Sequence, residues 1–132
     1  MKVYFSKLHE TLLFKLQGAV HYVTLYSPYI KKEVVGRLIS NVGSDVKIQM
    51  ICSWKIEDLA KGVSDIEVYH LLKEEGHHLF YCPSLHLKTY LFDDKHLLTG
   101  SANLTSKGLG ICEDTNLETL VEVDPIPNDY AI

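Results

Sequence analysis

Residues 86–103 read HLKTYLFDDKHLLTGSAN, and this stretch predicts a β-hairpin. Apolar, β-branched and aromatic residues flank Asp93 and Asp94, which is typical of two strands joined by a tight turn. Side chains two apart on a strand share a face, so His86 and Lys88 are expected to point the same way. Each polar residue is ordinary alone, and the question is whether the set forms one site.

The turn sets the register of this hairpin. A two-residue turn would pair Lys88 with Thr99 and His86 with Ser101, and would extend the same face to Asn103, although a β-bulge would shift the pairing. An imidazole can act as a nucleophile while an ammonium and an amide hold an anion. Such a group suits the oxyanion of a phosphate.

Length and composition limit the classes of protein to which the chain can belong. Its 132 residues are about the length of one domain, and 46% hydrophobic with 23% charged residues is an ordinary globular composition. The formal net charge of −4 argues against a broad basic surface for nucleic acid, but not against a local cationic cleft.

Targeting and cysteine usage point to the cytoplasm. No stretch is long and apolar enough for a signal peptide or a membrane span. Three cysteines without a CxxC pair suggest free, buried thiols in a reducing compartment. The polar, proline-containing end at residues 122–132 is typical of a domain edge or linker, so the chain could be the N-terminal domain of a longer protein.

Hydrophobic periodicity predicts an α/β fold with a mixed β-sheet flanked by helices. Helices are expected at residues 6–17 with Ser6 as cap, at 31–41, and at 64–76 with Ser64 and Glu67 as a capping box. Strands are expected at 20–28, 46–52 and 77–82, on both sides of the turn at 93–94, and at 117–123. Residues 54–62 and 104–115 are expected to be loops, the first with a short helical turn.

The hairpin carries a known signature. The segment H86-L-K88-T-Y-L-F-D93, followed by G100-S101-A-N103, resembles the HxK(x)4D(x)6GSxN motif of the phospholipase D superfamily at every defined position and spacing. One motif in so short a chain resembles the Nuc-type endonucleases and the NgoFVII/BfiI-like restriction nucleases. The strand ending in SPYI, the following helix and the VKIQMIC strand are similar to the front half of such domains. The resemblance therefore implies one phospholipase D-like catalytic domain over residues 1–132.

The resemblance implies a phosphodiesterase that uses no metal and no cofactor. His86 would attack phosphorus to form a phosphohistidine, and the partner subunit's His86 would protonate the leaving oxygen. Lys88 and Asn103 would bind the nonbridging oxygens with help from Ser101, and Asp93 would support the site. One histidine cannot readily be both nucleophile and acid in one step, so the site is expected at the two-fold axis of a homodimer.

A further acid of the family accepts a hydrogen bond from the catalytic histidine and fixes its tautomer. Glu118, in the segment NLETLV before the last strand, matches that place by context. Glu113 and Asp114 are the alternatives, because the loop before the strand varies in length.

The expected substrate is nucleic acid, with DNA favoured over RNA, in a restriction or defence setting. Two alternatives stay open. One is a hydrolase of lipid or other small phosphodiesters, which the lack of an amphipathic anchor disfavours, and no membrane contact is expected. The other is a non-catalytic module that binds nucleic acid.

Several residues near the motif have two readings. Ser27 ends a strand that borders the expected cleft and could line it. Trp54 and Lys55 combine an aromatic ring with a cation, which suits single-stranded nucleic acid, although core packing explains the tryptophan equally well. His77 and His78 suggest a metal site, but neighbours on a strand face opposite sides, which favours a structural reading.

Overall fold

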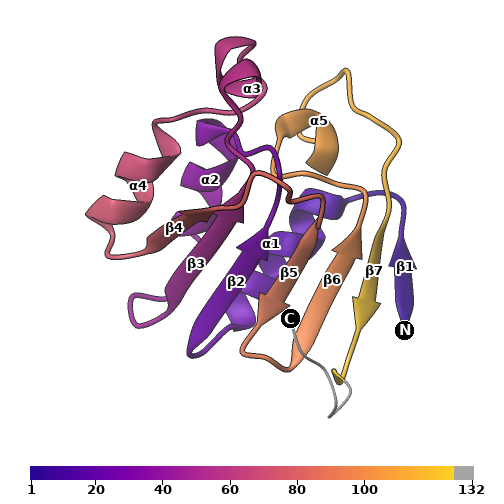
Figure 1. The fold of residues 1–132 in the computed structure, drawn as a ribbon. Helices are drawn as coiled ribbons and strands as arrows, with labels where there is room; N and C mark the ends of the chain where they lie inside the picture. Colours follow the sequence, from indigo (N-terminus) through magenta and orange to yellow (C-terminus); the bar gives the residue numbers. More distant parts are fainter. Residues whose placement is uncertain (127–132) are drawn as a thin grey trace.

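The computed structural model describes residues 1–126, which form one seven-stranded sheet with helices packed against it (Figure 1). The strands are β1 (Lys2–Tyr4), β2 (Tyr22–Tyr26), β3 (Lys47–Cys52), β4 (His78–Tyr81), β5 (Thr89–Phe92), β6 (His96–Gly100) and β7 (Leu120–Val123). The helices are α1 (Leu8–Gly18), α2 (Lys32–Ile39), α3 (Ile56–Ala60), α4 (Val68–Glu74) and α5 (Ser106–Leu109). The predicted α/β class is confirmed.

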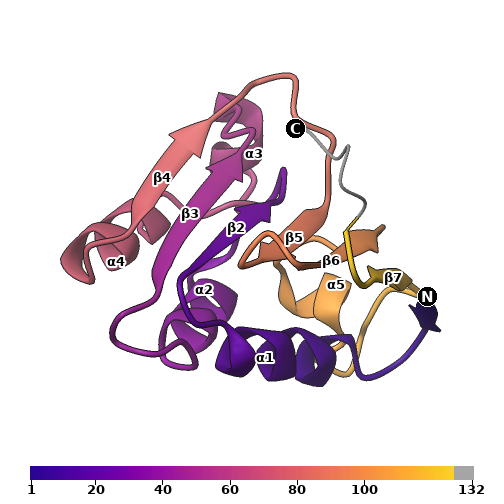
Figure 2. The same ribbon diagram turned by 90° about the horizontal axis from the view of Figure 1, so that it is seen from below.

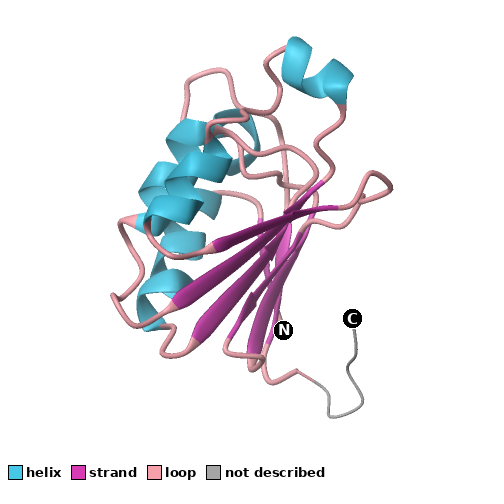
Figure 3. Ribbon diagram, turned by 60° about the vertical axis from the view of Figure 1, so that its left-hand side comes forward, coloured by secondary structure: helices cyan, strands magenta, loops and turns pink. Residues whose placement is uncertain are grey.

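The sheet is mixed, with strand order β1-β7-β6-β5-β2-β3-β4. Strands β2, β3 and β4 run parallel, and every other neighbouring pair is antiparallel. Helices gather on one face of the sheet, as Figures 2 and 3 show, and α3 lies beyond the carboxyl ends of β3 and β4 (Figure 1). In the described part of the chain, no helix has the length and apolar character needed to cross a bilayer.

The core lies between the helices and this face of the sheet. Helix α1 buries one leucine per turn, because residues four apart share a face of a helix. Alternate residues of the central strands face the helices and are buried. The buried core includes Leu8, Leu12, Leu16, Val23, Leu25, Val34, Leu38, Ile48, Met50, Tyr90, Phe92 and Leu98.

All three predicted helices form, but the two predicted caps do not. Helix α1 is preceded by Lys7 with φ 54° and has no side-chain cap, so Ser6 is not its N-cap. The hydroxyl of Ser64 accepts a hydrogen bond from the buried amide of Ile30 at 2.9 Å instead of capping α4. A buried amide needs an acceptor, so the Ser64 hydroxyl binds the Ile30 amide and is not available to cap α4.

The short elements are where the sequence-based prediction fails. Strand β1 and helix α5 were not predicted, since three or four residues carry no clear periodicity. Strand β7 starts at Leu120 rather than at residue 117. All three cysteines are free, but only Cys52 is buried, and burial raises the pKa of its thiol to about 12. Of the polar end at 122–132, residues 127–132 lie outside the described residues.

Candidate active site

The signature residues other than Asp93 gather at one end of the sheet, where β5 begins and β6 ends. Strand β5 runs antiparallel to β2, so its beginning lies beside the carboxyl end of the parallel strands (Figure 1). His86 and Lys88 lie in the extended segment just before β5, not within the strand as predicted. This end of the sheet is therefore built from the end of β2, the segment that carries His86 and Lys88, and the end of β6.

The predicted hairpin register is wrong by one residue. Asp93 and Asp94 adopt left-handed conformations with φ of 56° and 53°, which aspartate tolerates better than most residues. Phe92 pairs with His96 rather than with Lys95, which is left as an extra residue in a three-residue loop. The extra residue acts as a bulge would and shifts all pairs of the hairpin.

The shift places Lys88 opposite Gly100 instead of opposite Thr99. The amide of Gly100 donates to the carbonyl oxygen of Lys88 at 3.1 Å, which continues the ladder one residue beyond β5. The ammonium of Lys88 donates to the carbonyl oxygen of His86 at 3.1 Å, and the His86 side chain is exposed. The side chains of His86 and Lys88 therefore project from the same short segment at an accessible end of the sheet.

Ser101 and Asn103 lie at the same end of the sheet but on a loop, because β6 ends at Gly100. The hydroxyl of Ser101 accepts from the amide of Thr119 at 3.0 Å, so its own proton is free to be donated. The side-chain oxygen of Asn103 accepts from the amide of Tyr29 at 3.2 Å. With that oxygen occupied, the NH₂ group of Asn103 is the part that can bind an anion.

Ser27 is a positioning residue that the signature alone does not contain. Its hydroxyl donates to the carbonyl oxygen of Tyr29 at 2.7 Å and accepts from the amide of Leu104 at 3.0 Å. It also lies 3.4 Å from the side-chain oxygen of Asn103. The earlier reading of Ser27 as a possible lining residue thus becomes a specific role, in which it fixes the loop that carries Asn103.

Two glycines let the backbone pack closely around this loop. A Cβ atom on Gly100 would lie 2.1 Å from the carbonyl oxygen of Thr119, and one on Gly108 would lie 2.6 Å from that of Asn103. No real side chain tolerates these distances. Gly100 belongs to the signature, whereas Gly108 does not, and its spacing from Asn103 gives no recognisable pattern in the sequence.

Tyr90, on β5, supports the same loop from within the core. It is fully buried, and its hydroxyl donates to the carbonyl oxygen of Ala102. Burial raises the pKa of this phenol, so the tyrosine stays protonated and remains a donor. Tyr90 therefore packs in the core and holds the loop at Ala102.

Asp93 lies away from the other signature residues, at the opposite end of β5. It lies five positions after Lys88 along extended chain, a distance of roughly 16 Å. Its carboxylate accepts from the amides of Val20, His21 and Tyr22 at 2.9, 2.7 and 3.1 Å. Burial alone would raise the pKa of Asp93, but these hydrogen bonds outweigh it and lower the pKa. Asp93 therefore anchors the start of β2 and contacts no other signature side chain.

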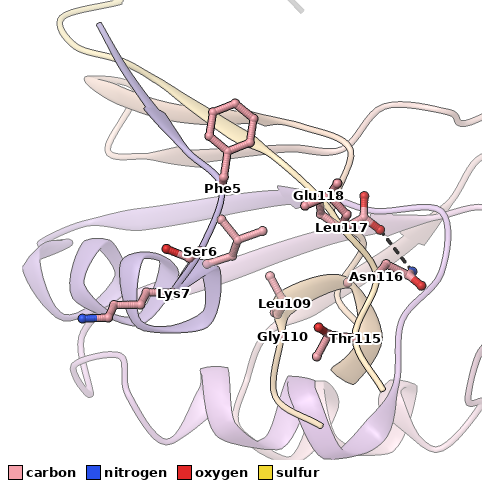
Figure 4. A pocket seen from close by; sticks show the side chains of 11 residues that line it. Phe5, Ser6, Lys7, Leu109, Gly110, Thr115, Asn116, Leu117 and Glu118 are labelled. Atoms are coloured by element: carbon pink, nitrogen blue, oxygen red, sulfur yellow. Dashed lines mark hydrogen bonds between the residues drawn. The ribbon is translucent and has the colours of Figure 1, made fainter. Parts of the chain in front are cut away.

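The three candidate acids lie before β7. Glu118 is half-buried, accepts from the side-chain Nδ2 of Asn116 at 3.1 Å, and lines an open pocket of about 450 Å³ (Figure 4). Its neighbour Thr119 is bonded to Ser101. Glu113 and Asp114 lie on an exposed loop. Among residues 1–126, the His86 imidazole forms no hydrogen bond with any of these carboxylates.

Titratable side chains elsewhere have structural roles. The two adjacent histidines face opposite sides, as predicted: His77 is buried and His78 is exposed. The Nδ1 atom of His77 accepts from the amide of Ile48 at 3.0 Å, and burial together with the charge of Lys47 lowers its pKa. Within residues 1–126, no three His, Cys, Asp or Glu side chains gather closely enough to hold a metal ion.

Comparison with known proteins places this geometry in context. Residues 12–126 match the family described as "Cardiolipin synthase, PLD-like domain", whereas no curated protein sequence matches the chain. Nuc from Salmonella typhimurium, a phospholipase D family member, is 20% identical with a TM-score of 0.66, over 96% of this chain and 83% of Nuc. NucT from Helicobacter pylori is 18% identical with a TM-score of 0.65, over 87% and 76%.

A third solved structure is similar in fold but much larger. Phosphatidylserine synthase from Haemophilus influenzae is 13% identical with a TM-score of 0.73, and the match covers 94% of this chain but 33% of the synthase. At these identities, the three structures show a shared fold.

Proposed function

The chain belongs to the phospholipase D-like domain family, and from that premise we propose that it is a metal-independent phosphodiesterase that hydrolyses nucleic acid. The observation that carries the proposal is the backbone hydrogen bond between Lys88 and Gly100. It joins the segment bearing His86 to the loop bearing Ser101 and Asn103. An imidazole, an ammonium, a hydroxyl and an amide can then act together on one phosphate.

In the proposed mechanism, His86 is the nucleophile. Its ring nitrogen bonds to phosphorus while the bond from phosphorus to the leaving oxygen breaks, and the imidazolium of the partner subunit's His86 gives that oxygen a proton. A water molecule then gives a proton to the partner's His86 and displaces the nitrogen of His86 from phosphorus. The products are an alcohol and a phosphate monoester, and both histidines return to their starting states.

Three further side chains bind the phosphate in this proposal. The ammonium of Lys88 and the amide NH₂ of Asn103 hold the nonbridging oxygens, and the hydroxyl of Ser101 donates a third hydrogen bond. Glu118 orients the His86 imidazole once the site is assembled, with Glu113 and Asp114 as the alternatives. Asp93 supports the fold of the hairpin rather than the chemistry.

The proposed active species is a homodimer with its two-fold axis beside His86. The chain supplies one signature, and the exposed position of His86 leaves it accessible to a second copy. Sedimentation equilibrium should show a dimer under assay conditions, and an active strict monomer would refute this part.

Nucleic acid is the favoured substrate, and DNA is favoured over RNA. The chain spans most of Nuc and NucT but only a third of the phosphatidylserine synthase, so the structural match to Nuc and NucT extends over more of those proteins. A restriction or defence role in a reducing cytoplasm agrees with three unpaired cysteines. Hydrolysis of lipid is the second candidate, because the synthase shares the fold, and a non-catalytic binding module is the third.

One experiment separates the three candidates. Purified protein is incubated in EDTA with a labelled single-stranded oligonucleotide, with duplex DNA, and with phosphatidylcholine vesicles. We expect cleavage of nucleic acid in EDTA, loss of cleavage in His86→Ala, and retention in the matched control His78→Ala, since His78 is also exposed but lies away from the motif. Hydrolysis of the vesicles alone would support the lipid candidate, and binding without cleavage would support the third.

A further inference from the structure

An open pocket of about 430 Å³ lies between the residues that follow β3 and β4, just before the segment that carries His86. Its walls include the aromatic rings of Trp54 and Tyr81, with Pro83 and the charged residues Lys55 and Glu57. The phosphodiesterase chemistry proposed above uses none of these residues. The features of this pocket fit a flat, polar-edged ring.

The two aromatic side chains, Trp54 and Tyr81, differ in how much of the ring is open to a ligand. Trp54 packs in part against the core, and its indole NH is buried without a hydrogen-bond partner among residues 1–126. Tyr81 is 67% exposed, so its ring is free to be stacked upon. Trp54 therefore forms a fixed wall of the pocket, and the core-packing reading and the ligand reading of this residue are compatible.

The charges of the pocket favour a neutral ligand group over a bare anion. Lys55 and Glu57 contribute one positive and one negative charge, which cancel. A nucleobase suits this lining, because its faces are apolar and its edges carry both donors and acceptors. A phosphate would meet the carboxylate of Glu57, and an acyl chain would bury both charged groups without a partner.

Backbone hydrogen bonds connect the pocket to Pro28, which precedes the Tyr29 amide that binds the side chain of Asn103. The amide of Ser53 donates to the carbonyl oxygen of Pro28 at 3.2 Å, and the amide of Cys82 donates to that of Cys52 at 2.8 Å. Two residues separate Pro83 from His86, so their Cα atoms, three steps apart along the chain, lie at most about 11 Å apart. A base in the pocket would thus belong to a nucleotide close to the scissile phosphate.

We propose that this pocket binds an unstacked base of a single-stranded nucleic acid, with Tyr81 stacking on the base and Trp54 forming the wall behind it. The inference rests on the proposed function and adds to it the strand state of the substrate. In a duplex the base faces are already stacked, so single strands and unpaired ends should be preferred.

The test uses Trp54 as its own reporter, because it is the only tryptophan in the chain. The His86→Ala protein, which should bind without cleaving, is titrated with a single-stranded oligonucleotide, its fully abasic counterpart and a duplex. We expect saturable quenching of Trp54 fluorescence by the single strand, with binding of the abasic strand and of the duplex about tenfold weaker or more. Tyr81→Ala should weaken single-strand binding by about tenfold.

Phe80→Ala is the matched control. Phe80 precedes Tyr81 on β4 and is 53% exposed, but it points to the other face of the sheet and does not line the pocket. Equal effects of Phe80→Ala and Tyr81→Ala, or equal affinity for intact and abasic strands, would overturn the inference. Quenching by short-chain phosphatidylcholine but not by the oligonucleotide would also overturn it, in favour of an acyl chain.

The outcomes for the pocket and for the chemistry are distinguishable. Hydrolysis of bis(p-nitrophenyl) phosphate by the wild-type protein in EDTA reports on the chemistry without a base. If hydrolysis occurs and base-dependent quenching does not, the inference fails and the proposed chemistry stands. If quenching occurs without hydrolysis of any phosphodiester, the pocket stands and the proposed function fails.

Discussion

Replacing Asp93 by alanine should destabilise the fold and leave the chemistry of each folded molecule intact. The substitution removes an acceptor of three backbone amides at 2.7–3.1 Å. One such bond contributes about 1 kcal/mol net, and these exposed amides recover water, so the loss is about 2 kcal/mol. Alanine in the left-handed conformation, φ 56° here, costs about 1 kcal/mol more. The sum, about 3 kcal/mol, corresponds to a fall of roughly 10 °C in Tm.

Asparagine at the same position tests the charge alone. Asp93→Asn keeps the tolerance for left-handed backbone and one acceptor oxygen, so we expect a loss of about 1 kcal/mol. The pKa of Asp93 is lowered in the folded protein, so its contribution is complete above the ordinary aspartate pKa. It is lost as the pH falls through the depressed folded value. The acid limb of a stability–pH curve should therefore be shallower in Asp93→Asn.

The assay is urea unfolding followed by circular dichroism, together with hydrolysis of bis(p-nitrophenyl) phosphate well below Tm. Asp94→Asn is the control, since Asp94 lies in the same turn but, among residues 1–126, accepts a hydrogen bond only from the hydroxyl of Tyr22. We expect less than about 1 kcal/mol for it. An Asp93→Asn protein of wild-type stability with the activity of His86→Ala would contradict a purely structural role, because the aspartate would then act in the chemistry.

Three further predictions concern the framework of the site. Gly100→Ala should lower the free energy of unfolding by more than about 3 kcal/mol in urea, since its Cβ would meet the carbonyl oxygen of Thr119 at 2.1 Å. Stability should fall as the pH drops below about 6.5, the ordinary histidine pKa, and passes through the lowered folded pKa of His77, and His77→Asn should flatten the urea midpoint on this acid side. Ser27→Ala should cost about 1–2 kcal/mol, because the buried amide of Leu104 loses its acceptor, and should lower kcat more than it raises KM.

The sequence predicts the central strands well because their signal is local. β2 and β3 are runs of β-branched and apolar residues that match strand periodicity. The hairpin on either side of Asp93 was also predicted, but its register depends on the left-handed turn and on Lys95. That turn is held by amides more than 70 residues earlier in the chain. No local pattern contains this information.

Local sequence patterns also leave part of the candidate site unpredicted. The residue types of the signature predict which side chains do chemistry, and the structure brings Lys88 to the Gly100 loop. The signature does not say that Asp93 lies at the far end of β5, because spacing along the chain does not state where a strand begins. Gly108 and Ser27 act through close packing and through hydrogen bonds to distant backbone. Such partners are defined only by the folded chain.

In the proposed mechanism, His86 is a nucleophile that bonds to phosphorus. The most direct measurement is rapid denaturation of the protein during turnover of an oligonucleotide in EDTA, followed by fragment mass spectrometry of the peptide that contains His86. We predict a covalent phosphoryl adduct on His86 that appears within the first turnover, decays when substrate is exhausted, and is absent in His86→Ala. Continued cleavage with an unmodified His86 at every time point would contradict the claim.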